Sequence, residues 1–274
     1  MTVEELLVEA KSKIHSDHAK LLLADLLNKN PLELFLYLDE EVEEGKRKLF
    51  LEEVEALKNN EPLQYVLGKV NFYKNEFKVN KNVLIPRFET EELVEKTLER
   101  IRKTFKKDNL KILDIGCGSG VIGITLKKHL PNSEVTLLDI SKEALEVAKE
   151  NAENLNVDVK FIESDVFENV YDTYDVIISN PPYIMENEEI EDIVKNNEPH
   201  LALYAGKDGL DCYKKIFKDI KRHLNNTYLI SLEIGMYQAP SIINMSNYFL
   251  GNNIIEVEKD LQGRDRMVFI TKVE

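Results

Sequence analysis

The sequence predicts an α/β protein: a doubly wound, mainly parallel seven-stranded sheet, preceded by a small N-terminal helical bundle and joined to it by a β-hairpin. Three observations predict it. From Leu110 onward, short apolar runs typical of buried strands alternate with helical patterns. From Thr2 to about Asn60 the pattern is helical and strongly charged. Between Tyr65 and Leu84 the hydrophobic period changes to two, which is typical of strands.

These changes of pattern predict three domains: a helical domain over residues 1–64, a hairpin linker over 65–84 and the sheet domain over 85–274. In the first, helices are expected from Thr2 and from Ser16, followed by a short helix begun by Leu34–Leu38 and a longer one over Val42–Leu57. In the linker, Lys74-Asn75 is the expected turn. Thr90 is expected to cap the helix that follows.

Seven apolar runs are expected to form the strands of the sheet. They are Leu110–Ile115, Glu134–Asp139, Val159–Ile162, Tyr174–Ser179, Tyr228–Ile234, Ile254–Glu258 and Met267–Thr271. The last two follow one another without a helical pattern between them. They are therefore expected to form an antiparallel hairpin at one edge of a sheet that is otherwise covered by helices on both faces.

Charge and composition exclude several classes of protein. The formal net charge is −14, which argues against an enzyme that tracks a nucleic-acid backbone, so no direct nucleic-acid partner is expected. No apolar run approaches the roughly 20 residues of a membrane span, and the N-terminus lacks a signal-peptide pattern. Cys117 and Cys212 lack metal-ligand or pairing spacing. We expect a cytoplasmic location, no membrane and no metal.

A glycine-rich string, Asp114–Gly123, lies between the first strand and the next helix. Its glycines allow a sharp turn and close approach of a ligand to the backbone. Asp114 would repel a phosphate and favour an ammonium, and Asp139, at the end of the next strand, is placed to accept both hydroxyls of a ribose. S-adenosylmethionine fits this pattern better than a dinucleotide. Two alternatives remain. One is a dinucleotide site, because Gly118–Gly123 is a literal G-x-G-x-x-G, and the other is that the loop binds no ligand.

The third strand is followed by Glu163–Phe167. Asp165 is placed to accept a hydrogen bond from an adenine amino group, with Val166 or Phe167 against the ring. The alternative is a surface loop with one packed aromatic side chain.

The fourth strand runs into Asn180-Pro181-Pro182-Tyr183, called here the clamp. Its prolines remove two backbone donors and hold the chain extended, which leaves an amide, free carbonyls and an aromatic face. The glycine loop, Asp139, Asp165 and Asn180 all follow strands, and ligands of doubly wound sheets gather at these carboxyl ends. A ligand site with the clamp beside it is therefore favoured over a rigid turn.

The clamp suits a planar group that bears an NH2. The Asn180 side-chain oxygen and the Pro181 carbonyl can each accept one N–H bond, which directs the nitrogen lone pair at a methyl sulfonium and stabilises the charge that grows on nitrogen. Tyr183 can pack flat on the planar group. Asn180, Pro181 and Tyr183 are the predicted catalytic residues. No general base is needed before transfer, so the histidines, among them His223, are expected at the surface.

Further segments resemble one family over nearly the whole chain. They are Glu61–Gly68, Leu84–Glu91, Glu198–Leu203, Lys207–Leu210, Glu233–Gly235 and Asp260–Arg266. With the clamp, they resemble the peptide chain release factor glutamine N5-methyltransferases, which are class I methyltransferases. Asn-Pro-Pro-Tyr alone is shared with adenine-N6 DNA and guanine-N2 RNA enzymes. Pro-Arg-x-Glu-Thr-Glu behind a helical domain is more specific.

The resemblance implies methyl transfer from S-adenosylmethionine to the side-chain nitrogen of the glutamine in the Gly-Gly-Gln motif of release factors, with S-adenosylhomocysteine as product. It places substrate binding on Asn180, Pro181, Pro182 and Tyr183. Cofactor binding is expected from Gly116, Cys117, Gly118, Ser119, Gly120, Asp139, Asp165, Val166 and Asn180, with Phe167 as the alternative to Val166. The sequence departs from the family at Phe88, where proline is usual, and at Ala205-Gly206, where Gly-Gly is frequent.

Two other readings share these residues. One keeps the chemistry but moves it to a ribosomal-protein glutamine or to an amino group of DNA or RNA. The other is a cofactor-binding module without activity, which the intact clamp disfavours. The acidic stretch Glu186–Asp192 is either part of a lid or docking surface or a solvated helix. A monomer is expected.

Overall fold

The computed structural model describes residues 1–274 and divides into two compact units. The first contains residues 1–69 and 191–197, and the second contains residues 70–190 and 198–274. The proposed roles and boundaries of the three sequence domains stay predictions. No helix is both long and apolar enough to cross a membrane.

The first unit is built from helices around one apolar core. Its elements are α1 (Val3–Lys11), α2 (Ser16–Leu27), the 3-10 helix η1 (Pro31–Tyr37), α3 (Glu44–Lys58), α4 (Leu63–Leu67) and α8 (Asp192–Asn197). Thr2 and Glu5 form a capping box that starts α1. The expected short third helix is the 3-10 helix η1. Leu34 is buried there while Phe35 and Leu36 are exposed, so the segment has no wide apolar stripe to support an α-helix.

The acidic stretch before α8 is helical only at its end. Residues 186–187 form a turn, residues 188–191 have no regular secondary structure, and the helix begins at Asp192. The Asn197 side-chain amide of α8 donates a hydrogen bond to the Asn60 carbonyl at 2.9 Å. The end of this stretch is therefore part of the helical unit.

The hairpin consists of β1 (Lys69–Phe72) and β2 (Asn75–Lys78). Its turn is Tyr73-Lys74, one residue earlier than expected, and both residues have positive φ (47° and 64°), as the tight turns of two-residue hairpins require. The rings of Phe72 and Phe77 meet edge to face at 6.0 Å and belong to the core of the second unit.

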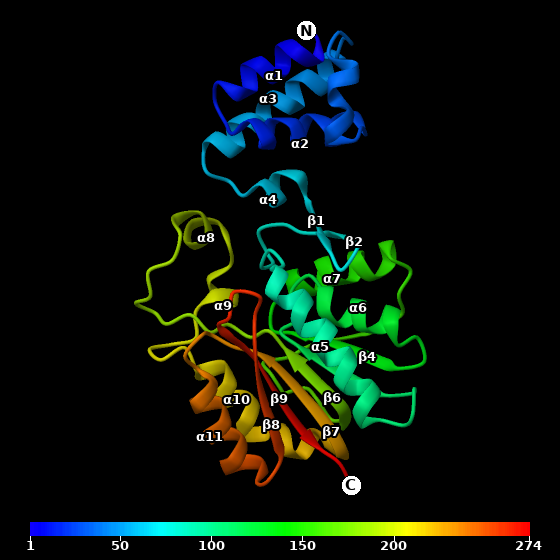
Figure 1. Cartoon of the computed structure of the whole chain (residues 1–274), viewed down its shortest axis with the longest axis vertical. Helices are drawn as coiled ribbons and strands as arrows, with labels where there is room; N and C mark the ends of the chain where they lie inside the picture. Colours follow the sequence, from blue (N-terminus) through cyan, green and yellow to red (C-terminus); the bar gives the residue numbers. More distant parts are fainter. The chain divides into compact units, whose positions relative to one another are not determined.

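The second unit contains the predicted seven-stranded sheet (Figure 1). Its strands are β3 (Lys111–Ile115), β4 (Glu134–Asp139), β5 (Lys160–Glu163), β6 (Tyr174–Ser179), β7 (Leu224–Glu233), β8 (Ile254–Lys259) and β9 (Asp265–Lys272). The order is β5-β4-β3-β6-β7-β9-β8, and β9 runs antiparallel to the other six strands. The chain reverses its direction of travel across the sheet between β3 and β6. The carboxyl ends of these two strands therefore form the crevice where doubly wound sheets bind ligands.

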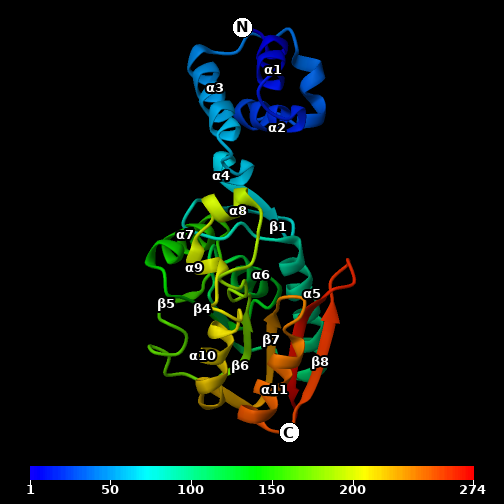
Figure 2. The same ribbon diagram turned by 90° about the vertical axis from the view of Figure 1, so that its left-hand side faces the viewer.

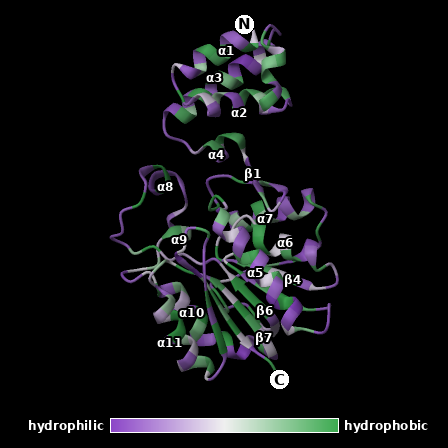
Figure 3. Ribbon diagram, in the orientation of Figure 1, coloured by the Kyte–Doolittle hydropathy of each residue, from purple (hydrophilic) through white to green (hydrophobic).

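Helices cover both faces of the sheet (Figure 2). α5 (Phe88–Thr104), α6 (Val121–His129) and α7 (Lys142–Asn154) share one apolar core, and α10 (Asp211–Asp219) and α11 (Ala239–Leu250) share the other. Val176 and Ile178 of β6 face the first core, and Ile177 faces the second, as the alternation of a strand requires. Figure 3 shows that β6 and β7 are hydrophobic. Such strands are expected where helices cover both faces of a sheet.

Two sequence-based expectations are wrong. Thr90 does not cap α5: the N-cap is Arg87, without a side-chain hydrogen bond, and Thr90 is buried within the first turn. His223, in the 3-10 helix η2 (Ile220–His223), is buried instead of exposed. Its ring stacks on Phe167 at 4.4 Å, and its Nδ1 lies 3.0 Å from the Asp172 carbonyl oxygen. Burial on an aromatic ring gives this histidine a packing role that its sequence neighbourhood does not reveal.

Candidate active site

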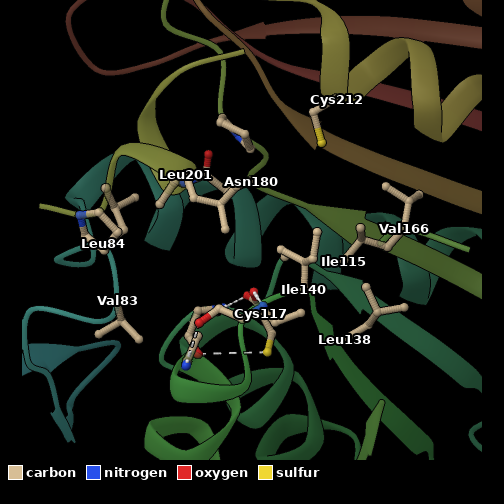
Figure 4. A pocket seen from close by; sticks show the side chains of 18 of the residues that line it. Val83, Leu84, Ile115, Cys117, Leu138, Ile140, Val166, Asn180, Leu201 and Cys212 are labelled. Carbon is tan, nitrogen blue, oxygen red and sulfur yellow. Dashed lines mark hydrogen bonds between the residues drawn. The ribbon is translucent and has the colours of Figure 1, made fainter. Parts of the chain in front are cut away.

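A cavity of about 420 Å³ opens at the carboxyl ends of β3, β4 and β6. This volume lies in the range of roughly 300–1,000 Å³ that is typical of small-molecule sites. In Figure 4, Val83, Leu84 and Leu201 line one side, Leu138 and Val166 line the other, and Asn180 lies between them. Leu201 belongs to the short helix α9 (His200–Leu203).

The glycine loop forms the floor of this cavity, and Gly116 to Ser119 line it. Gly116 and Gly118 have φ of +70° and +54°, which only glycine adopts without strain. The Gly116 and Cys117 N–H groups donate to the Leu138 carbonyl, which ties the loop to the end of β4. Gly120 is the N-cap of α6 and faces Leu137 and Ala148, so a side chain here would clash. Gly120 therefore brings the helix against the sheet instead of lining the cavity.

Asp139 lies at the cavity wall, as expected, and is nearly buried. Its two carboxylate oxygens accept hydrogen bonds from the Gly118 and Ser141 N–H groups, both at 2.9 Å. Burial raises the pKa of this carboxyl, and the backbone donors partly offset that rise. A carboxylate has about four lone-pair positions, so Asp139 retains the capacity to accept ligand hydroxyls.

Asp114 does not fit its expected role. The side chain is fully buried beneath the loop, does not line the cavity, and accepts a hydrogen bond from the Gly123 N–H at 2.9 Å. Burial raises its pKa to about 7, and Asp139 adds to the rise. An ammonium in the cavity therefore does not meet Asp114 directly. Of the carboxylates that line the cavity, Asp139 is the one hydrogen-bonded to the glycine loop, and it would disfavour a phosphate there.

The loop after β5 contributes Asp165 and Val166 to the cavity wall. Val166 has φ of +51°, a strained conformation for a β-branched residue. The Ser164 hydroxyl holds it by donating to the Val166 carbonyl at 3.0 Å. Phe167 instead packs on His223. Of the two candidates for the adenine contact, the geometry therefore favours Val166. Asp165 forms an ion pair of 2.5 Å with Lys215, so part of its acceptor capacity is engaged.

The clamp is divided between the cavity and the protein interior. Asn180 and Pro182 line the cavity, whereas Pro181 is buried and the side chain of Tyr183 packs against the core beside Gly235. The Asn180 Nδ2 donates to Thr90 Oγ1 at 3.1 Å, and Thr90 Oγ1 donates to Glu233 Oε2 at 2.8 Å. These two hydrogen bonds connect Asn180 to Glu233 through Thr90, and the Asn180 nitrogen faces Thr90.

Sequence reasoning assigned no role to the residues that hold the cavity rim. Glu198 is buried and accepts hydrogen bonds from Arg87 Nη2 at 2.5 Å and from the Ile85 N–H at 3.1 Å. It thereby joins the segment before α5 to the segment before α9, and both line the cavity. The partners are more than 110 residues apart. The only signal for them is that both lie in segments of the family resemblance.

Both cysteines line the same cavity. Burial raises the pKa of the Cys212 thiol to about 12 and that of Cys117 as well. Since the thiolate is the reactive form, neither cysteine is poised as a nucleophile.

Comparison with known proteins identifies two regions of the chain. A family model described as the PrmC N-terminal domain matches residues 2–68, and one described as the Methyltransferase small domain matches residues 91–202. Solved structures share the architecture. The crystal structure of a methyltransferase from Pyrococcus furiosus matches with a TM-score of 0.55 and 17% identity, covering 84% of this chain and 99% of that one. The ribosomal protein L11 methylase from Lactobacillus delbrueckii subsp. bulgaricus matches with a TM-score of 0.53 and 20% identity, covering 75% and 90%.

The sheet order, the helices on both faces and the methyltransferase domain match define a class I methyltransferase. Curated relatives narrow the class. The release factor glutamine methyltransferase of Bacillus anthracis is 38% identical over 255 residues, covering 91% of this chain and 90% of the relative. That of Streptococcus pneumoniae is 42% identical over 236 residues, covering 85% and 83%. The chain belongs to the release factor glutamine methyltransferase family.

Proposed function

We propose that this enzyme transfers a methyl group from S-adenosylmethionine to the side-chain nitrogen N5 of the glutamine in the Gly-Gly-Gln motif of peptide chain release factors. The observation that carries the proposal is the Asn180 amide, held by its nitrogen at the wall of a cavity whose floor is the glycine loop. Membership of the family supplies the substrate. The reaction belongs in the cytoplasm, where release factors act, and the predicted monomer needs no partner subunit.

The residues of the cavity fit S-adenosylmethionine. Open space above Gly116 and Gly118 leaves room for a ligand against the backbone, since a side-chain carbon at either position would meet no atom within 4 Å. Asp139 would accept the ribose hydroxyls, and Val166 would pack on the adenine, with Asp165 near its amino group. S-adenosylmethionine supplies a methyl group activated by its positively charged sulfur, with S-adenosylhomocysteine as product.

The clamp would act on the acceptor glutamine. An amide nitrogen is a poor nucleophile because its lone pair is delocalised into the carbonyl. Asn180 Oδ1 and the Pro181 carbonyl each accept one of its N–H bonds, which orients the nitrogen for in-line attack and stabilises its growing positive charge. Pro182 borders the slot for the planar amide, whereas Tyr183 supports the clamp from the core side. The methylated nitrogen is acidic and gives its proton to water, so no side chain need act as a base.

Residues 1–64 are proposed to recognise the release factor. Three apolar side chains of η1 are exposed although they lie beside a well-packed core. They are Leu32, Phe35 and Leu36, exposed by 81%, 67% and 63%. Exposed apolar side chains gathered on one short segment are typical of interaction surfaces.

A transfer assay with several acceptors tests the proposed function. Methyl-labelled S-adenosylmethionine is offered in parallel with a release factor, ribosomal proteins, DNA and RNA. We expect label in the release factor alone, and none when its Gly-Gly-Gln glutamine is changed to alanine. Label only in ribosomal protein or nucleic acid would contradict the substrate assignment while keeping the methyltransferase chemistry.

A further inference from the structure

We propose that Thr90 and Glu233 are positioning residues that set the orientation of the Asn180 amide, so that its oxygen and not its nitrogen faces the acceptor. The expected effect on catalysis rests on the proposed function. The orientation of the Asn180 amide does not, because it depends only on contacts within the protein. Thr90 lies in the first turn of α5, Glu233 ends β7 and Asn180 follows β6, and a continuous line of hydrogen bonds connects the three.

The direction of the hydrogen bonds follows from the number of hydrogens. A threonine hydroxyl has one hydrogen and can accept with its lone pairs. In the structure that hydrogen is donated to Glu233 Oε2, so Thr90 Oγ1 can only accept from Asn180. The amide therefore turns its NH2 toward Thr90 and leaves Oδ1 for an incoming N–H donor. The reversed amide would face the glutamine NH2 with its own NH2, and two donors repel.

The line of hydrogen bonds is built into the interior. Thr90 is 3% exposed and Glu233 is 1% exposed, so water does not compete for either group. The Tyr213 hydroxyl donates to the Glu233 backbone carbonyl at 2.7 Å, which holds the end of β7 in place. A buried hydroxyl that bridges two polar groups on different elements holds them in place more strongly than an exposed one, because losing it leaves the buried partners without a hydrogen bond.

Glu233 must be ionised for the line to have this direction. Burial raises its pKa to about 7, and the Thr90 hydrogen bond and the nearby Arg266 oppose the rise. Below that pH the protonated carboxyl can donate to Thr90 Oγ1, which frees the Thr90 hydrogen for Asn180 Oδ1 and reverses the amide. The charged and titratable groups that act on Glu233 from neighbouring elements are Arg266, Glu89, Arg87, Tyr183 and Tyr213.

Four variants test the inference through kcat, KM and the affinity for S-adenosylmethionine. Thr90→Val keeps the shape but loses the hydroxyl, and we expect kcat to fall ~10-fold with cofactor affinity within about 2-fold. Thr90→Ser restores the hydroxyl and should recover most of kcat. Thr97→Val is the matched control, because Thr97 is buried in the same helix and its hydroxyl has no hydrogen-bond partner. Wild-type kcat should fall as pH drops below about 7, and Glu233→Gln should lose that fall.

The Asn180 side-chain signals in ¹⁵N NMR spectra give a readout that needs neither acceptor nor turnover. In the ligand-free wild type they should shift with pH around 7, and Thr90→Val and Glu233→Gln should abolish the shift while Thr97→Val keeps it. An unchanged kcat in Thr90→Val or no recovery in Thr90→Ser would each overturn the inference. A wild type that methylates no release factor yet shows the titration would overturn the proposed function and leave the positioning role intact.

Discussion

At the scale of single residues, the site depends on side chains that hydrogen bonds within the protein hold in place. Asp139 is fixed by two N–H donors, and the Asn180 amide is fixed by the Thr90 hydroxyl. Donors and acceptors fixed in this way need little reorganisation during the reaction, which is where enzymes gain most of their electrostatic stabilisation. We therefore expect the two side chains to have separable effects, Asp139 on cofactor binding and Asn180 on the transfer step.

Removing the Asn180 amide should affect the transfer step. In Asn180→Ala one of the two proposed acceptors for the glutamine N–H groups is lost, and we expect kcat to fall ~100-fold or more. The affinity for S-adenosylmethionine, measured by calorimetry, should change little. Turnover near that of the wild type in this variant would contradict the clamp mechanism.

Replacing Asp139 should affect cofactor binding. Asp139→Asn exchanges one acceptor oxygen for an NH2 group that faces the N–H of Gly118 or Ser141. We expect the Kd for S-adenosylmethionine to rise by roughly 10- to 100-fold. Glu163→Gln is the control, because Glu163 ends the neighbouring strand β5 outside the cavity. Equal Kd values for S-adenosylmethionine in the two variants would contradict the proposed contact between Asp139 and the ribose.

The sequence was enough to predict where Asn180, Asp139 and the glycine loop meet, because each follows a strand and parallel strands share one carboxyl edge. It could not predict that Thr90 bridges Glu233 and Asn180, since Thr90 and Glu233 are 143 residues apart and neither spacing nor periodicity encodes that contact. The role predicted for Asp114 was wrong for a related reason. The polarity of a side chain does not say whether the strand turns it toward the ligand or toward α6.

At the scale of elements, the β1–β2 hairpin is anchored to the second unit on two sides. Phe72 and Phe77 enter the sheet core, and the Asn151 side chain of α7 bonds both the N–H and the carbonyl of Lys78. Asn151 also donates to the Ser119 carbonyl at 2.8 Å. One buried amide therefore connects the hairpin to the glycine loop.

Truncating the buried ring of the hairpin should cost stability. Phe77 is fully buried, and Phe77→Ala is expected to lower the free energy of unfolding by about 3–5 kcal/mol through lost burial and a cavity. Phe88→Ala, at a side chain that is 60% exposed, should change it by about 0.5 kcal/mol or less. Urea denaturation of both variants makes the comparison. Similar losses would mean that the hairpin is not part of the core.

Elements were predicted best where a long pattern was available. The period-two segment gave the hairpin, but its turn moved by one residue because Tyr73 and Lys74 both adopt positive φ, which their side chains do not favour. The segment Pro31–Tyr37 has apolar residues at helical spacing, yet only Leu34 finds a core to face. Periodicity describes which residues can share a face, and packing decides which of them do.

At the scale of the whole molecule, buried acids link stability to pH. The pKa values of Glu53, Asp114 and Glu233 are each raised to about 7, mainly by burial. A raised folded-state pKa means that the folded protein binds the proton more tightly than the unfolded chain. The stabilising contribution of each acid to the free energy of unfolding is therefore fully present below about pH 4 and is lost as pH rises toward and through 7.

Asp114→Asn should remove the part of the pH dependence of stability that comes from Asp114. At pH 5 the wild-type carboxyl is mostly neutral and the two proteins should be similar in stability. At pH 8 the wild type holds a buried charge and the variant does not, so the variant should gain on the order of 2 kcal/mol relative to the wild type. Urea unfolding at both pH values measures the difference. Asp158→Asn, at an exposed position, is the control, and an equal gain there would refute burial as the cause.

The position of β9 in the sheet affects how the protein can be made. β9 comes after β8 in the chain but lies between β7 and β8. During synthesis from the N-terminus, β8 therefore emerges before its only partner exists, and β7 presents an unpaired edge until residue 272 has been added. An open strand edge can pair with another chain. The growing polypeptide thus passes through an aggregation-prone stage that ends when β9 inserts, and the glycine loop and clamp meet on a finished sheet only after that step.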